Sequence, residues 1–113
     1  MVGPKDAVMF DIDDTLIASG TGKRIESVYK IYQQVKRAGY KIVIVTARPA
    51  FEMNVRWTQN QLLTNGITYD DLVFASPENK GYYKRRSKYN FILSVGDMDT
   101  DLTDSLYSIK IST

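Results

Sequence analysis

The sequence predicts an α/β fold: a three-layer α/β/α sandwich with a parallel sheet of five strands at its centre. Five short apolar runs alternate with longer segments of helical periodicity, which is typical of βαβ units. The runs IVIV and FIL lack polar alternation, as expected of central strands covered on both faces. At 113 residues, the chain is expected to form one domain, residues 1–113.

The first strand and the first helix carry the clearest patterns. Apolar side chains from Ile25 to Ala38 recur at three- and four-residue spacing, and Gly39 follows as a stop signal. This pattern predicts a helix directly after the first strand and its loop. The five strands are expected at 7–12, 41–46, 71–76, 90–95 and 107–111.

The later helices have weaker patterns. The second is expected to begin at Pro49, a favoured first-turn residue, and to stop at Asn65 and Gly66. The segments ENKGYYKRRSKY and DTDLTDSL are expected to supply a third helix and a short fourth helix of barely two turns.

Composition excludes several classes of enzyme and site. With no Cys and no His, the chain has no thiolate or imidazole for nucleophilic catalysis or metal binding. A net charge of +2 favours no particular partner. No apolar run is long enough to cross a bilayer and no export signal is visible, so a cytoplasmic location is expected.

Polar residues stand where three of the expected strands end. Asp11 and Asp13 end the first strand, Thr46 the second and Asp97 the fourth. In open α/β sheets, ligands bind outside the carboxyl ends of the strands. Residues two apart in an extended segment point the same way, so Asp11 and Asp13 can address one site while Ile12 turns into the core. Mg²⁺ prefers such oxygen ligands, and the pattern favours a magnesium site.

Three motifs resemble those of the haloacid dehalogenase (HAD) superfamily of phosphohydrolases. DIDDT is similar to its DxDxT nucleophile motif, IVTAR to its second motif and VGDMDTD to its GDxxxD motif. Within the superfamily, TARP and GDMDTDL most resemble class B acid phosphatases, with the phosphatase domain of polynucleotide kinases as a near neighbour. The resemblance covers nearly the whole chain and implies a HAD-like sheet without a cap domain, because no cap insertion is visible.

The resemblance also implies roles for individual residues. Asp11 would be the nucleophile that forms an aspartyl-phosphate, and Asp13 the general acid and base. Thr46 would bind the phosphoryl oxygens, with Ala47, Arg48 and Lys80 as further substrate contacts. Mg²⁺ would be held by the Asp11 and Asp97 carboxylates and by the Asp13 carbonyl, with Asp101 behind them.

The lysine of the third motif is open among Lys80, Lys84 and Lys88, which all lie in one basic segment. We favour Lys84 as the catalytic lysine because the YK pair followed by a short helix resembles the acid phosphatases. The interval from Lys84 to Asp97 is shorter than in that family, which keeps Lys80 as an alternative.

Several polar residues also have interpretations that involve no catalytic role. Asp14 favours turn or cap chemistry, and Arg48 is either a substrate contact or a solvated loop charge. The segment GTGK lacks the leading glycine and the final Ser or Thr of a phosphate loop, so we reject that interpretation. The basic and tyrosine-rich segment KGYYKRRSKY suits single-stranded nucleic acid, but we favour a solvated helix face that carries one catalytic lysine.

The sequence therefore predicts a capless, Mg²⁺-dependent phosphatase that hydrolyses phosphate monoesters. Its partner would be a phosphorylated small molecule or a nucleic-acid end. One alternative is a polynucleotide-end phosphatase, and another is a non-catalytic module that binds phosphate or phosphoprotein. Oligomers are possible because a capless site is open, and no membrane partner is expected.

Overall fold

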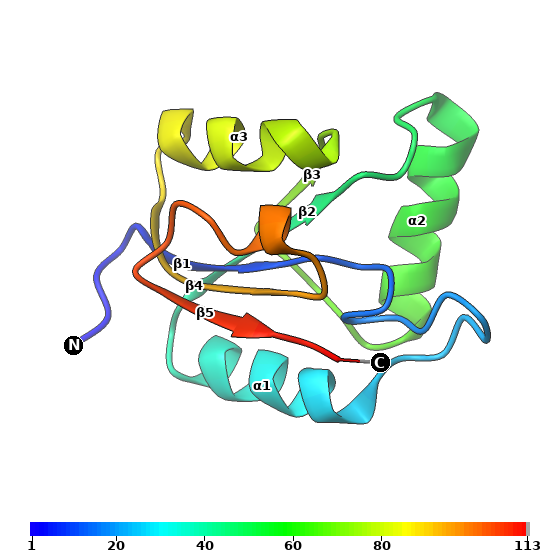
Figure 1. Ribbon diagram of the computed structural model, residues 1–113. Helices are drawn as coiled ribbons and strands as arrows, with labels where there is room; N and C mark the ends of the chain where they lie inside the picture. The colour runs from blue at the N-terminus through cyan, green and yellow to red at the C-terminus, as the bar shows by residue number, and fades with distance from the viewer. Residues whose placement is uncertain (113) are drawn as a thin grey trace.

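The chain folds around a five-stranded parallel sheet in the order β3-β2-β1-β4-β5 (Figure 1). This computed structural model describes residues 1–112. The sheet places β1 at its centre and the later strands on both sides of it. All four strand pairings are parallel, as the alternation of runs predicts. The strands are β1 Asp6–Phe10, β2 Lys41–Thr46, β3 Asp71–Phe74, β4 Asn90–Gly96 and β5 Tyr107–Lys110.

Helices cover both faces of the sheet and form the outer layers. On one face, Val28 and Tyr32 of α1 and Leu62 of α2 pack with Phe10 of β1 and Ile44 of β2 in the larger core. On the other, α3 packs on a smaller core, and Figure 1 shows α1 and α3 on opposite sides of the sheet. The predicted three-layer α/β/α sandwich is confirmed. The helices are α1 Glu26–Arg37, α2 Glu52–Thr64 and α3 Lys80–Arg86, and short 3₁₀ turns occupy η1 Pro77–Asn79 and η2 Asp99–Asp101.

The strands predicted at 7–12 and 71–76 end earlier, at Phe10 and Phe74, and two of the helices also differ from the sequence prediction. The second helix begins at Glu52 rather than Pro49, because the backbone amides of Asn54 and Val55 donate to the Phe51 carbonyl. The predicted fourth helix is only the η2 turn, since Asp104 has φ of 61° and no helix continues through that conformation. The segment between β4 and β5 is therefore mainly loop.

The loop after β1 is a compact turn structure. Asp14 has φ of 58°, and its Oδ1 accepts hydrogen bonds from the backbone and the hydroxyl of Ser19. This matches the turn role expected of Asp14. A bridge between Ile17 and Arg24 closes the GTGK segment as a hairpin, and Gly22 supplies its positive φ of 71°. Within residues 1–112, the connections between elements carry no cap domain.

The described part of the chain contains no helix that is both long and apolar enough to span a membrane.

Candidate active site

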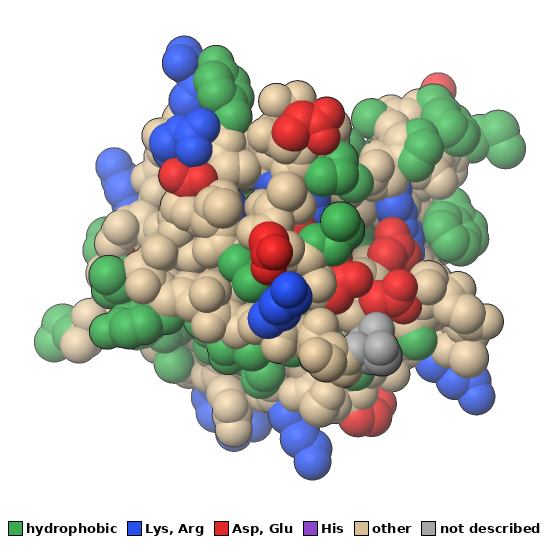
Figure 2. All heavy atoms as spheres, in the orientation of Figure 1, with side chains coloured by type: hydrophobic (Ala, Val, Ile, Leu, Met, Phe, Trp, Pro, Cys, Tyr) green, Lys and Arg blue, Asp and Glu red, His purple; other side chains and the backbone are tan. Residues whose placement is uncertain are grey.

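Three carboxylates gather where β1 and β4 end side by side. Asp11 directly follows β1, Asp97 directly follows β4, and Asp101 closes the η2 turn. One carboxylate oxygen from each lies within 4.8 Å of the others. Figure 2 shows acidic side chains clustered on this part of the surface. The structure thus brings together the three aspartate side chains that the sequence analysis placed at a metal site.

The ammonium of Lys80 ties this acidic cluster together. Its Nζ lies 2.9 Å from Asp11 Oδ1 and 2.6 Å from Asp101 Oδ1. The Lys80 side chain is only 3% exposed, and both of its partners are buried. The hydroxyl of Thr15 donates to the other oxygen of Asp11, Oδ2, at 3.3 Å. Asp11 is therefore held at both oxygens.

The cluster carries more negative charge than its lysine can neutralise. Burial raises the pKa of Asp11 to about 7, although the charge of Lys80 opposes the rise and that of Asp101 adds to it. Burial also disfavours the ammonium of Lys80, but attraction to Asp11 and the hydrogen bonds that the ammonium donates to both carboxylates outweigh this effect and raise the Lys80 pKa. One ammonium among three carboxylates leaves the cluster with a net negative charge. The donor set, all oxygen, fits a hard divalent cation such as Mg²⁺.

Lys84, the favoured candidate from the sequence, does not contact Asp11. Its Nζ donates to Ser94 Oγ at 3.1 Å and to the backbone carbonyl of Asp101 at 2.8 Å. Burial lowers the pKa of Lys84 to about 8. Lys80 and Lys84 are one helical turn apart, and the first turn of α3 is the one that lies against the acidic cluster. Lys80, the alternative candidate, is therefore the lysine that pairs with Asp11, and Lys84 instead donates to the backbone of Asp101. The third candidate, Lys88, follows α3, and its Nζ lies 5.3 Å from the centre of the Tyr89 ring.

The close approach of η2 to β4 depends on a glycine. A Cβ atom at Gly96 would lie 2.3 Å from the Cβ of Asp101, so no larger residue fits there without a shift. Asp101 Oδ2 also accepts a hydrogen bond of 3.2 Å from the Met98 amide, which closes the turn. The glycine before Asp97 thus lets Asp101 reach the cluster.

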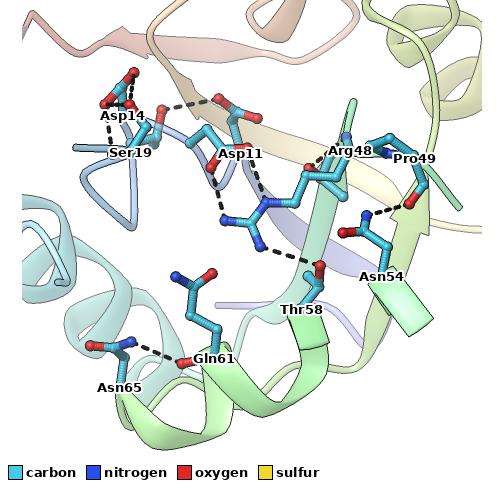
Figure 3. Close-up of polar contacts among 12 residues, drawn as sticks. Asp11, Asp14, Ser19, Arg48, Pro49, Asn54, Thr58, Gln61 and Asn65 are labelled. Atoms are coloured by element: carbon cyan, nitrogen blue, oxygen red, sulfur yellow. Dashed lines mark hydrogen bonds and ion pairs between the residues drawn. The ribbon is translucent and has the colours of Figure 1, made fainter. Parts of the chain in front are cut away.

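Arg48 holds Asp13 on the outer side of the site. Its Nε and Nη2 donate to the two oxygens of Asp13 at 3.0 and 2.8 Å. Its Nη1 donates to Thr58 on α2 at 3.2 Å, and Figure 3 shows Arg48 reaching across to that helix. Arg48 is therefore not a solvated loop charge, because its side chain is only 9% exposed and is anchored to Asp13, the second carboxylate of the first motif.

Thr46 and Ala47 complete the loop after β2. Thr46 is fully buried, and its hydroxyl accepts a hydrogen bond of 3.2 Å from the Arg48 amide. Ala47 is exposed between them. The parallel pairing of β1 with β2 places the end of β2 beside the end of β1, and so near Asp11.

The tyrosines of the basic segment divide between core and surface. Tyr83 and Tyr89 pack against Phe91 in the smaller core, and the Tyr89 hydroxyl donates to Asp71. Tyr82 remains exposed, with the guanidinium of Arg86 at 5.2 Å from its ring. Two of the three rings that suggested a nucleic-acid surface therefore serve the fold.

Comparison with known proteins assigns the chain to a family. The family model described as HAD superfamily, subfamily IIIB (acid phosphatase) matches residues 16–112, a segment that begins just after the DIDDT motif. No curated protein sequence matches the chain.

A similar fold occurs in a solved structure described as "Structure of Pnkp1/Rnl/Hen1 complex". The TM-score is 0.73 at 18% sequence identity, over 95% of this chain. The chain spans 46%, or about half, of that solved chain. At this identity the similarity concerns the fold.

Proposed function

Since the chain belongs to the HAD superfamily, subfamily IIIB (acid phosphatase), we propose that the protein hydrolyses phosphate monoesters, with Mg²⁺, through an aspartyl-phosphate on Asp11. The observation that carries the proposal is the buried contact of Lys80 with Asp11 and Asp101, next to Asp97. A lysine in this place neutralises the nucleophile and offers a positive charge to the incoming phosphate.

In the first half-reaction Asp11 is the nucleophile. A carboxylate oxygen of Asp11 forms a bond to phosphorus while the bond between phosphorus and the ester oxygen breaks. Asp13 donates its proton to the departing oxygen. Asp13 suits this task because its side chain is 44% exposed, so that Arg48 can release one of its oxygens to a ligand.

In the second half-reaction the intermediate is hydrolysed. The Asp13 carboxylate takes a proton from water, the water oxygen bonds to phosphorus, and the bond from phosphorus to Asp11 breaks. Inorganic phosphate leaves, and both aspartates return to their starting states. Lys80 and the hydroxyl of Thr46 stabilise the phosphoryl oxygens through both steps.

Asp11 and Asp97 would hold Mg²⁺ through their carboxylates and Asp13 through its main-chain carbonyl. Asp101 would stand behind them, since Lys80 and the Met98 amide already use its oxygens. When bound, the cation neutralises charge on the phosphoryl group and on the nucleophile. The net negative charge of the cluster supports this assignment.

The first experiment measures hydrolysis of a small aryl phosphate with and without excess EDTA. Asp11→Asn is expected to abolish turnover, because the amide keeps the side-chain volume but is no nucleophile. The matched control is Asp14→Asn, because Asp14 serves the neighbouring turn and Asn also tolerates a positive φ. Turnover by the pure Asp11→Asn variant, or undiminished activity in EDTA, would refute the mechanism.

A second measurement identifies the nucleophile directly. Beryllofluoride with Mg²⁺ mimics a phosphoryl group and is expected to form an adduct on Asp11, visible in a crystal structure. An adduct on Asp13 would instead identify Asp13 as the nucleophile and leave Asp11 as the general acid and base.

A polynucleotide-end phosphatase is the second candidate, and the exposed Tyr82 with Arg86 beside its ring favours it. Phosphorylated oligonucleotides should then exceed mononucleotides in kcat/KM, and their binding should weaken steeply with salt. Replacing Arg85 and Arg86 together by Gln should flatten that salt dependence. Equal kcat/KM for oligonucleotide and mononucleotide at low salt would eliminate this candidate.

A further inference from the structure

We propose that the open edge of β5 is an interface through which two copies of this chain pair, with their β5 strands antiparallel about a two-fold axis at Ser108. The pairing continues the sheet of one copy into the sheet of the other. The inference goes beyond the proposed function, because β5 contributes no residue to the acidic cluster.

The two edges of the sheet differ in how they are covered. The edge strand β3 is half-buried at all four positions, whereas β5 is exposed at all four. Within residues 1–112 no strand pairs with the outer side of β5, and no helix crosses in front of it in Figure 1. An open edge presents unpaired N–H and C=O groups that favour pairing with another strand. Proline and bulges prevent such pairing elsewhere, and β5 has neither.

The side chains of β5 alternate between apolar and polar. Tyr107 and Ile109 pair with Leu93 and Val95 of β4, which lie in or against the larger core, so they extend the apolar face of the sheet that α1 covers. Tyr107 is nevertheless 65% exposed, and Leu106 just before it is 67% exposed. This alternation is typical of a strand with one covered face, although in the single chain that face is open to water.

The backbone of β5 determines the register of the pairing. The amide of Leu106 donates to the Phe91 carbonyl of β4, so alternation along the strand turns the N–H and C=O groups of Tyr107 and Ile109 toward the open edge. In an antiparallel pair, two opposite residues of this kind exchange two hydrogen bonds. Pairing Tyr107 of each copy with Ile109 of the other therefore makes four hydrogen bonds and places Ser108 on the two-fold axis.

The side chains are complementary in this same register. Each Tyr107 ring lies beside Ile109 of the other copy, an aromatic and β-branched pair of the kind that stabilises antiparallel strands. Lys110 ends one strand and comes beside the start of the other, which Asp104 precedes, so charges of opposite sign approach there. Parallel pairing of the two edges would instead align like charges. The edge is therefore complementary to a second copy in the antiparallel arrangement.

The interface is small, and the dimer is expected to be weak. Stable complexes use about 20–30 residues a side, whereas this edge offers Leu106 and the four residues of β5, so we expect a Kd of about 10–100 µM. The antiparallel strands direct the two acidic clusters to opposite ends of the dimer, because each cluster lies at the carboxyl ends of its own strands.

Sedimentation equilibrium of the 113-residue chain from about 1 to 500 µM tests the association. The average mass should rise with concentration from that of one chain, 12.9 kDa, toward twice that value. Tyr107→Lys should raise the Kd about tenfold or more, because both Tyr107 contacts with Ile109 are lost. Leu63→Lys is the matched control, since Leu63 lies on α2, is 66% exposed and acquires the same charge. A monomer at every concentration, or equal weakening by the two variants, would overturn the inference.

A cysteine cross-link tests the register, because the chain has no cysteine of its own. Opposite residues that do not exchange hydrogen bonds have Cα atoms about 4.5 Å apart, within the span of a disulfide. Ser108→Cys should therefore form a covalent dimer under mild oxidation with diamide. Ser112→Cys is the matched control, since the two copies of this residue would stand roughly 26 Å apart and should not cross-link.

The cross-link decides the matter even if Tyr107→Lys does not fold, which far-UV circular dichroism detects. Equal cross-linking of Ser108→Cys and Ser112→Cys would indicate random collision and overturn the pairing. Association of the unaltered chain without a Ser108→Cys cross-link would place the interface elsewhere and also overturn it. Neither experiment measures hydrolysis, so the proposed function and this inference stand or fall separately.

Discussion

The two lysine and arginine ion-pair groups of the site, Lys80 with Asp11 and Asp101 and Arg48 with Asp13, differ in depth, and the difference corresponds to what each is expected to do. Lys80, Asp11 and Asp101 are all buried, and their side chains have fixed partners on several sides. Asp13 is half-exposed, and Arg48 alone holds it in place. A nucleophile and its counter-charge gain from being immobile. A proton donor must change partners, and the rim of the site allows that.

The largest expected effect comes from removing the ammonium of the buried pair. Lys80→Met leaves buried carboxylates without their counter-charge, so the free energy of unfolding without divalent cations should fall by about 3–5 kcal/mol. Turnover should fall by about 10²–10³-fold, since a charge aimed at the phosphate is lost. Urea denaturation and aryl phosphate hydrolysis measure the two effects.

Lys84→Met is the matched control for this variant, because Lys84 is equally buried on the same helix but bonds Ser94 and a backbone carbonyl. Its turnover should fall by far less than that of Lys80→Met. The reverse order of the two variants would return the catalytic role to Lys84.

An intermediate effect is expected where the buried pair depends on close packing. A methyl group at position 96 would meet Asp101, so Gly96→Ala should lower the free energy of unfolding by about 1–3 kcal/mol. Mg²⁺ affinity should also weaken, as measured by calorimetry. Gly20→Ala is the control, since a Cβ there meets nothing within 4 Å. Similar behaviour of the two variants would mean that η2 does not need its close approach to β4.

The smallest expected effect is on the stability of the outer pair. Arg48→Gln should lower the free energy of unfolding by only about 1 kcal/mol, because solvent screens the half-exposed Asp13. Arg56→Gln removes an exposed ion pair with Glu52, one turn away on α2, and should change the free energy of unfolding by less than about 0.5 kcal/mol. A loss for Arg48→Gln as large as that for Lys80→Met would remove the distinction between the two pairs.

The parts of the fold that follow from local pattern were predicted well. The interiors of the two strands at the centre of the sheet are apolar runs, and the first helix has a regular apolar stripe and is followed by a glycine. Each of these signals lies within the segment that it describes. The start of the second helix was wrong by three residues, because a favourable proline at 49 does not decide which carbonyl accepts the first helical hydrogen bonds.

The choice between Lys80 and Lys84 shows where sequence reasoning stops. The two residues are four apart on one helix and therefore lie on the same face, so periodicity treats them alike. Only the position of α3 along the sheet puts the first of them beside Asp11 and the second beneath Asp101. The same packing leaves Tyr83 and Tyr89 partly buried against the smaller core, although the sequence suggested them as a surface for nucleic acid.

The sequence by itself determined the order of the strands and helices, the absence of thiol and imidazole chemistry, and which aspartates stand where strands end. Those properties depend on residue type and on spacing within a segment. The tertiary structure decided which charges meet: Lys80 with Asp11 and Asp101, and Arg48 with Asp13. Such contacts join residues that are tens of positions apart, and the packing of whole elements brings their side chains within hydrogen-bonding distance.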